Sequence, residues 1–213
     1  VPLLRKYYNN CTYGLCEYSV GVKLMWRHVF NSEFAENHGC LIIKNTIDGE
    51  TSFDLPVPGK GGDFSAAMDE IDLYCTEHGL CPVFGPVPKE KIGELVLRYP
   101  YASYGNIRNW QDYIYYSGDL QDFVGKKYSG QRNHIKKFNA AYPNAIFTVL
   151  TENDFLLIEK FWEEYSTEFS KTDNESAKKE LKISKELLPK LVGDGFFLGG
   201  FVNDGRLLSL SLG

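Results

Sequence analysis

The sequence predicts an α+β protein in which helices flank a mixed sheet and one structural unit occurs twice. Apolar residues repeat with helical periodicity in some segments and with strand periodicity in others. Asp48-Gly49 and Asn203-Asp204-Gly205 each separate two strand-like segments, which indicates two antiparallel hairpins. The 213 residues, 43% hydrophobic and 24% charged, are typical of a folded chain with a real core. This length allows one large domain or two small ones.

The first half predicts helices around a hairpin and a glycine-rich turn. Asp63 is suited to the N-cap of the helix after this turn, and Gly79 to its C-terminal stop. The expected elements are a helix at Tyr18–Phe30, strands at Cys40–Asn45 and Thr51–Val57, a helix with the apolar stripe Phe64, Ala67, Met68, Ile71, Tyr74 and Cys75, a strand at Cys81–Phe84, a helix at Lys89–Arg98 and a strand at Tyr104–Tyr116.

The second half predicts a strand, two helices and a hairpin after a basic helix. Thr151 and Asp154 have the spacing of a capping box at the start of the first of the two helices. The expected elements are the basic helix at Gly130–Ala141, a strand at Ala145–Leu150, a helix with the apolar face Phe155, Ile158, Trp162, Tyr165 and Phe169, a helix at Ser176–Val192, and strands at Phe196–Val202 and Arg206–Leu212.

The order of these elements predicts a duplication. Both halves combine helices with an antiparallel hairpin, and only the first half continues into a glycine turn, a helix and a strand. We therefore expect a first domain at residues 1–125, a basic linking helix at 126–143, and the N-terminal part of a second domain at 144–213. The second copy would stop before its own glycine turn.

Charge and cysteine content exclude several classes of protein. The net charge of −5 argues against general affinity for nucleic acid or anionic membranes. No segment has the roughly 20 apolar residues that a bilayer span requires, and the first ten residues lack a signal peptide's apolar run. Five dispersed cysteines indicate free thiols and a cytoplasmic location. Cys75, His78 and Cys81 lack the four convergent ligands of a structural zinc site, so we expect no metal.

The glycine turn is the first candidate binding site. Gly59, Lys60, Gly61 and Gly62 lie between a strand and a helix, where backbone N–H groups and the helix dipole favour a phosphate. The sequence is neither a Walker loop nor a dinucleotide fingerprint. An ordinary surface connection is the alternative interpretation.

A basic segment is the second candidate site. No Asp or Glu occurs between Phe123 and Thr151, and five cations give this stretch a charge of +5. Such a concentration on an acidic protein predicts an anionic ligand, and a solvated helix face is the alternative. Ile135, Phe138 and Tyr142 would form the buried side of the helix. The cations are Lys126, Lys127, Arg132, Lys136 and Lys137.

Aromatic residues before the basic segment form a third candidate site. Trp110, Tyr113 and Tyr115 could stack on the terminal adenosine of a tRNA or of coenzyme A (CoA). Tyrosines that cover a sheet or join two domains are the alternative.

The stretch 123–138, Phe-Val-Gly-Lys-Lys-Tyr-Ser-Gly-Gln-Arg-Asn-His-Ile-Lys-Lys-Phe, resembles the central motif of a family of mostly uncharacterised bacterial proteins. These proteins are similar to the C-terminal catalytic domain of phosphatidylglycerol lysyltransferase. Trp26-Arg27, Leu55-Pro56 and Trp110–Tyr116 also resemble that family. The resemblance implies a tandem pair of GNAT-type acyltransferase folds with a truncated second copy, and a native chain that continues past Gly213.

The resemblance also implies an activity. Known relatives transfer an aminoacyl group from aminoacyl-tRNA to an amine or hydroxyl, whereas ordinary GNAT enzymes use acyl-CoA. Either donor would be a co-substrate, no further cofactor would be required, and the acceptor could be a small molecule, a peptide or a lipid. Lys60 and the missing leading Arg or Gln depart from the acyl-CoA pattern. Arg132 and His134 would lie nearest the reacting end, and no Ser-His-Asp or Cys-His constellation is evident.

A non-catalytic alternative uses the same residues. An RNA-binding module, or a pseudo-enzyme that supports a partner, would also need the basic segment and the tyrosines. RNA binding of this kind would weaken steeply with salt, without turnover of an acyl donor. The sequence does not specify the acceptor, the general base or the oligomeric state.

Overall fold

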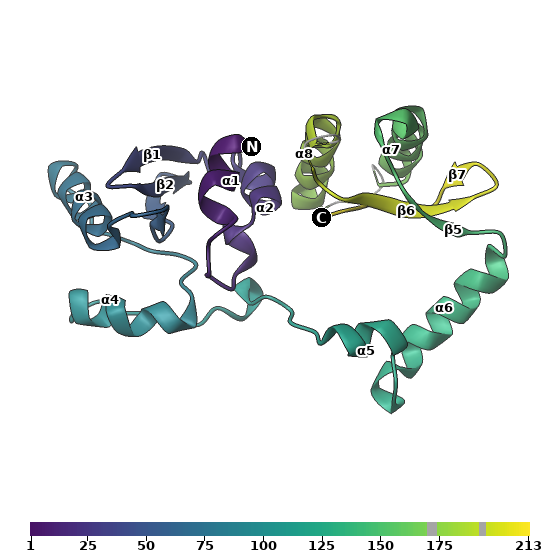
Figure 1. The fold of residues 1–213 in the computed structure, drawn as a ribbon, viewed down its shortest axis with the longest axis horizontal. Helices are drawn as coiled ribbons and strands as arrows, with labels where there is room; N and C mark the ends of the chain where they lie inside the picture. Colours follow the sequence, from purple (N-terminus) through teal and green to yellow (C-terminus); the bar gives the residue numbers. More distant parts are fainter. Residues whose placement is uncertain (170–173, 192–194) are drawn as a thin grey trace. The chain divides into compact units, whose positions relative to one another are not determined.

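The computed structural model describes residues 1–169, 174–191 and 195–213. It divides into two compact units, Val1–Asp112 (unit 1) and Tyr113–Gly213 (unit 2), each with its own four-stranded sheet (Figure 1). The α+β class with flanking helices is thus confirmed. The expected mixed sheet is wrong, because the paired strands of both sheets run antiparallel. The domain ranges 1–125, 126–143 and 144–213 stay a prediction.

The sheet of unit 1 is built around one long central strand. Strand β2 pairs with β1 on one side, and on the other with β3 and β4. Asp48 and Gly49 join β2 to β3 with φ values of 51° and 85°, as the predicted tight turn requires. The strands are β1 Glu33–Asn37, β2 Cys40–Ile47, β3 Glu50–Phe53 and β4 Val57–Pro58.

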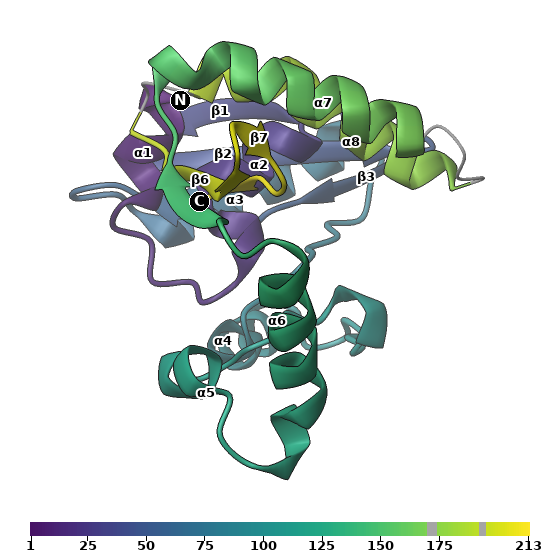
Figure 2. The same cartoon turned by 90° about the vertical axis from the view of Figure 1, so that its right-hand side faces the viewer.

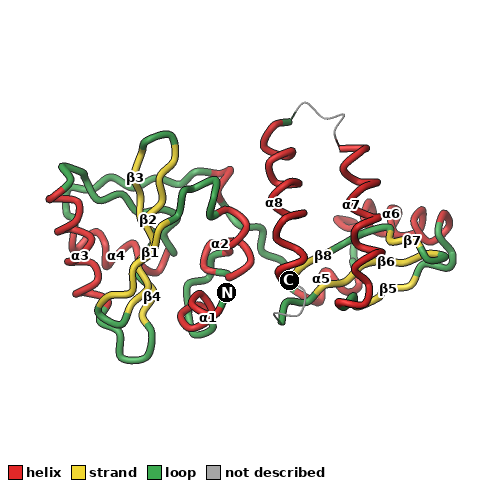
Figure 3. Tube along the Cα trace, turned by 90° about the horizontal axis from the view of Figure 1, so that it is seen from above, coloured by secondary structure: helices red, strands yellow, loops and turns green. Residues whose placement is uncertain are grey.

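Helices cover both faces of the unit 1 sheet. Helices α1 (Pro2–Tyr8) and α2 (Val20–Trp26) lie on one face, and α3 (Phe64–Glu77) lies on the other (Figures 1 and 3). Cys40 to Ile43 of β2 are therefore all buried, which explains an apolar run without polar alternation. The predicted α3 stripe is confirmed, with Met68 and Ile71 each 1% exposed.

The predicted ends of α3 are also confirmed. The Asp63 side chain accepts a hydrogen bond from the Ala66 N–H at 3.0 Å, and Gly79 has a φ of +64° just after the helix. Short helices follow at Lys89–Lys91 (η2), Ile92–Arg98 (α4) and Arg108–Trp110 (η3).

Some expected elements of the first half are wrong. The range 104–116 contains no strand, because its tyrosines are exposed and no neighbouring strand pairs with it among the described residues. Among the residues that the structure describes, the range 81–84 makes one parallel bridge, Phe53 to Phe84, and no ladder, since Pro82 lacks the N–H that a ladder needs. The helix expected at 18–30 is shorter, because Ser19 caps it and Tyr18 belongs to a 3₁₀ turn, η1 (Cys16–Tyr18).

Unit 2 has a sheet with two long helices on one face. Helices α7 (Phe155–Phe169) and α8 (Glu175–Leu191) run side by side over it (Figures 2 and 3). The capping box of Thr151 and Asp154 is confirmed at η5 (Glu152–Asp154), and Val192 of the predicted second helix lies outside the described residues. The strands are β5 Ile146–Val149, β6 Leu198–Asn203, β7 Arg206–Leu207 and β8 Ser211–Leu212.

The two sheets share one pairing pattern. In each, a central strand (β2 or β6) pairs with one strand at one edge and with two short strands at the other. The hairpin turn of unit 2, at Asp204 and Gly205, also has two positive φ values, 48° and 77°. The connections differ, because two residues join β1 to β2 whereas α7 and α8 join β5 to β6. No helix in the described ranges is long and apolar enough to cross a bilayer.

Candidate functional site

The basic segment, residues 126–137, lies on two consecutive helices of unit 2. Helix α5 (Ser117–Asp122) precedes it, η4 (Lys126–Tyr128) begins it, and α6 (Ser129–Ala141) carries the remainder. All five cations are exposed, and α6 begins without a side-chain cap or an acidic residue in its first turn. The uncapped N-terminus adds positive potential beside Lys126.

One of the five cations is neutralised by a carboxylate. The Nζ of Lys127 and the hydroxyl of Tyr128 each donate a hydrogen bond of 3.0 Å to the same oxygen of Asp119. These bonds, chiefly that from Lys127, lower the pKa of Asp119. The sequence pattern missed this partner because Asp119 lies four residues before the acid-free stretch begins.

The Asp119 contact predicts a pH-dependent local structure. Because its folded pKa is lowered, the contact is intact above the ordinary carboxyl value of 3.8 and is lost as the pH falls through the lower folded value. We expect an NMR titration of Asp119 to have a midpoint below 3.8, and Lys127→Met to raise that midpoint. An identical midpoint in the variant would contradict the assigned contact.

Arg132 is turned toward the backbone. Its Nη1 donates to the carbonyl oxygens of Phe123 and Gly125, the latter at 2.8 Å, and so fixes the turn where α5 ends. Phe123 adopts a left-handed conformation there, with a φ of 48°. His134 is exposed and makes no side-chain hydrogen bond within the described ranges. Arg132 therefore stabilises the turn before the basic segment with part of its guanidinium. The roles of Arg132 and His134 near a reacting group stay a prediction.

Four of the five cations lack a carboxylate partner among the described residues, and three of these four are lysines that bind no other group. Lys126, Lys136 and Lys137 have neither an ion pair nor a hydrogen bond in the part of the chain that the structure describes. Three exposed ammonium groups without carboxylate partners can bind phosphate oxygens without first breaking an internal contact. This chemistry requires neither a metal nor a covalent nucleophile.

Helix α6 packs against the sheet of unit 2 through its C-terminal end. The Phe138 ring packs against Phe201 of β6, with ring centroids 5.2 Å apart. The expected buried side of the helix is otherwise wrong, because Ile135 and Tyr142 are 45% and 36% exposed. Helix α6 leads away from the sheet of unit 2 (Figure 2), and its basic residues are exposed.

The glycine turn packs against the β1–β2 turn of unit 1. The N–H groups of Gly59 and Asp63 donate to the carbonyls of Gly39 and His38, at 2.9 and 2.8 Å. A methyl group added at Gly62 would lie 2.5 Å from the Gly39 oxygen. Close packing thus explains why glycine occupies positions 59 and 62. Lys60 and Gly61 are exposed, and phosphate binding by this turn stays a prediction.

Gly62→Ala is expected to destabilise unit 1 by about 1–3 kcal/mol, since both backbones must move to admit the methyl group. Gly61 has a φ of +74° and open space around it, so Gly61→Asn should cost less than about 1 kcal/mol. Hydrogen exchange of the β2 amides reports this stability. Equal effects of the two substitutions would show that the turn is not tightly packed.

The aromatic residues are exposed and lie outside any strand. Tyr113 and Tyr115 are 80% and 55% exposed, and their rings stack at 6.5 Å with an interplanar angle of 14°. Trp110 is 55% exposed in unit 1. These tyrosines do not cover a sheet, and stacking on a base stays a prediction.

Cys16 lies beside two carboxylates, which the sequence pattern did not predict. Its sulfur, a Glu17 oxygen and an Asp112 oxygen lie within 4.8 Å of one another. Partial desolvation and Asp112 raise the pKa of the exposed Cys16 thiol to about 12, which disfavours the thiolate form that binds metals. Asp112 instead accepts a hydrogen bond of 3.0 Å from the Cys16 N–H, which anchors residue 112 to unit 1. Cys75 is buried in α3 and Cys81 is exposed after it.

Comparisons with known proteins agree with this architecture. A crystal structure described as a conserved protein of unknown function from Bacteroides thetaiotaomicron VPI-5482 matches with a TM-score of 0.78 and 20% identity, over 100% of this chain and 71% of that chain. This likeness shows the fold alone. No curated protein gives a significant match. The family described as "Phosphatidylglycerol lysyltransferase, C-terminal" matches residues 11–208, which include the basic segment, the sheet of unit 1 and strands β5 to β7 of unit 2. The chain therefore belongs to the phosphatidylglycerol lysyltransferase C-terminal family.

Proposed function

We propose that this protein transfers an acyl or aminoacyl group directly from a phosphorylated carrier to an amine or hydroxyl acceptor. The carrier is tRNA or CoA, and the basic segment binds its phosphates. Membership of a lysyltransferase family supports transfer of an aminoacyl group from tRNA. The proposal includes two GNAT-type units, and the shared pairing pattern of the two sheets supports it.

The observation that carries the proposal is the set of three exposed lysines without carboxylate partners. Lys126, Lys136 and Lys137 belong to a protein with a net charge of −5, so their charge is local. Mobile phosphate groups gain most from cations that are not already paired. The stacked Tyr113 and Tyr115 rings offer a surface for the adenosine that ends both carriers.

The proposed reaction is one addition and one elimination. The acceptor's nitrogen or oxygen attacks the acyl carbon, the bond from that carbon to the carrier's oxygen or sulfur breaks, and the acceptor's proton passes to the leaving group. Backbone N–H groups would stabilise the oxyanion. Direct attack needs no nucleophilic side chain, in keeping with a sequence that lacks a Ser-His-Asp or Cys-His constellation.

Thermal stabilisation of the full-length protein tests the proposal. Aminoacyl-tRNA, uncharged tRNA, acyl-CoA and CoA are compared at equal concentration, because a ligand that binds only the folded state raises the melting temperature. We expect one of the two carriers, tRNA or CoA, to raise the melting temperature. When a mixture of amines is added, the acylated form of that carrier should lose its acyl group to an amine. Stabilisation by neither carrier would refute the proposal.

A non-catalytic RNA-binding module is the second candidate, and the exposed stacked tyrosines favour it. It predicts binding of charged and uncharged tRNA with equal affinity and no loss of the aminoacyl group. A pseudo-enzyme would give the same result and would need a partner protein for activity. Turnover of an acylated carrier separates the transferase from both.

A further inference from the structure

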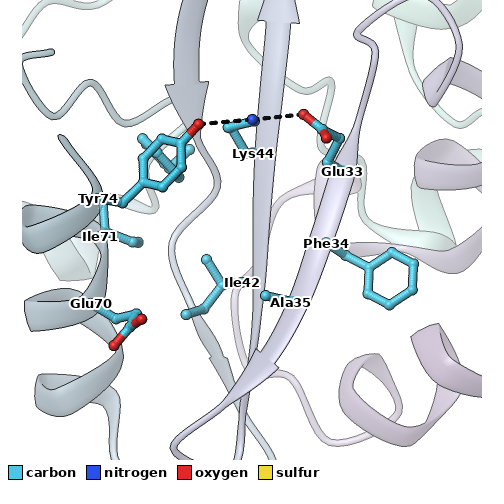
Figure 4. Close-up of a pocket in the computed structure, with 9 residues that line it drawn as sticks. Glu33, Phe34, Ala35, Ile42, Lys44, Glu70, Ile71 and Tyr74 are labelled. Carbon is cyan, nitrogen blue, oxygen red and sulfur yellow. Dashed lines mark hydrogen bonds and ion pairs between the residues drawn. The ribbon is translucent and has the colours of Figure 1, made fainter. Parts of the chain in front are cut away.

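Unit 1 contains a cavity of about 220 Å³ between α3 and the two strands β1 and β2. Figure 4 shows Ile71 and Tyr74 of α3 facing Ile42 and Lys44 of β2, with Ala35 of β1 beyond them. Residues that line it are Glu33, Phe34, Ala35, Ile42, Lys44, Phe53, Glu70, Ile71 and Tyr74.

The floor of the cavity is apolar and fixed by the core. Ile42, Phe53 and Ile71 are 7%, 3% and 1% exposed, so their positions are set by packing within unit 1. Ala35 lies on the exposed strand β1, paired with Ile42, and its small side chain leaves the cavity open. A small hydrocarbon group that binds in such a cavity is removed from water, which favours binding.

The charges at the rim differ in how they are balanced. The Lys44 Nζ lies 2.7 Å from a Glu33 oxygen and donates a hydrogen bond of 3.0 Å to the Tyr74 hydroxyl (Figure 4). Within the described ranges, the one ion-pair partner of Glu70 is the Nε2 of His38, at 3.5 Å, and this contact is an ion pair only when the imidazole is protonated. Near neutral pH the cavity therefore has one carboxylate without a permanently charged partner among the described residues.

We propose that this cavity binds a small apolar ligand that carries a protonated amine, with the ammonium group against Glu70 and the hydrocarbon over Ile42 and Ile71. A carboxylate ligand is disfavoured, because it would have to displace Glu33 from Lys44 and would face Glu70. The site lies within unit 1 and uses no residue of the basic segment. A test of this amine site therefore does not depend on whether the proposed transfer reaction takes place.

The probe for this site is 2-phenylethylamine, with 3-phenylpropionate as its anionic counterpart, added to the full-length protein with ¹⁵N labelling. We expect the amine to shift the amide signals of Ala35, Ile42 and Ile71, and the carboxylate to bind several-fold more weakly. Glu70→Gln should weaken amine binding about three- to fivefold, as for a partly exposed ion pair. Glu77→Gln, a change of the same charge farther along α3, should leave the affinity unchanged.

A blocking variant tests the position of the site. Ala35→Leu places a larger side chain over the cavity from an exposed strand position, and should abolish the shifts at Ile42 and Ile71. Ala102→Leu, at an exposed position outside the cavity, is the matched control. Protection of the β2 amides from hydrogen exchange verifies that each variant is folded. Absence of shifts in the unmodified protein, equal binding of the carboxylate, or full binding by Ala35→Leu or Glu70→Gln would overturn the proposal.

Discussion

Asp54→Ala is expected to destabilise unit 1 by about 3–5 kcal/mol, because it leaves a buried ammonium group without its partner. The side chains of Lys23 and Asp54 are 8% and 4% exposed, and Nζ lies 2.5 Å from Oδ2. Asn45 donates a hydrogen bond of 2.9 Å to the other Asp54 oxygen. This network joins α2 to the end of β3, at the centre of unit 1.

Apolar side chains of similar size at positions 23 and 54 should stabilise unit 1 about as well as the Lys23–Asp54 ion pair does. Burial raises the pKa of Asp54 despite the opposing effects of Lys23 and Asn45, so the cost of desolvation is large. The double variant Lys23→Met, Asp54→Leu should therefore recover most of the stability that Asp54→Ala loses.

Hydrogen exchange of the β2 amides measures both variants, since it reports unit 1 separately from unit 2. Glu94→Ala is the control. It breaks the Lys91–Glu94 pair of 2.7 Å, in which the Glu94 side chain is 50% exposed, and should cost less than about 1 kcal/mol. This account would be contradicted if Asp54→Ala cost less than about 1 kcal/mol, as Glu94→Ala should. It would also be contradicted if the double variant were as unstable as Asp54→Ala alone.

Replacing the three unpaired lysines should have the largest effect on ligand binding. We expect Lys126→Ala, Lys136→Ala, Lys137→Ala to weaken binding of the phosphorylated carrier roughly 200- to 2,000-fold at about 0.1 M salt, from about 1–1.5 kcal/mol per lost hydrogen bond and about 3–4.5 kcal/mol in total. These exposed side chains have no partner among the described residues, so the melting temperature should change little.

A matched triple variant separates site binding from net charge. Lys179, Lys182 and Lys185 are exposed on α8, and their replacement by alanine removes the same charge from another surface of unit 2. We expect less than a threefold change in carrier affinity from this control, since exposed charges beyond about 10 Å are largely screened. Equal losses in the two triple variants would indicate a general charge effect.

Local signals in the sequence predicted much of the fold. The cap at Asp63, the stop at Gly79, the two Asp-Gly turns and the Thr151 capping box depend on residues within a few positions of each other, and all are confirmed. The expected strand at 104–116 was wrong because tyrosine favours strands only where a neighbouring strand covers it.

Contacts distant in the sequence were beyond local patterns. The pattern of cations located the basic segment, but it could not show that Asp119 neutralises Lys127 or that Arg132 binds backbone carbonyls. Lys23 and Asp54 are 31 residues apart in the sequence. Each is a charged residue of the kind that usually lies at the surface, so neither one predicts a buried ion pair by itself. The cavity beside Lys44 likewise combines four elements, β1, β2, β3 and α3, that only the folded chain brings together.

The salt dependence of carrier binding tests the central claim most directly. Affinities of the full-length protein and of the Lys126, Lys136, Lys137 triple variant for tRNA and for CoA are measured between 50 and 200 mM salt. Three phosphate contacts predict a slope of log affinity against log salt of about −2 to −3 for the carrier that binds, and a slope near zero for the variant. The same slope in both proteins, or binding of neither carrier, would contradict the account.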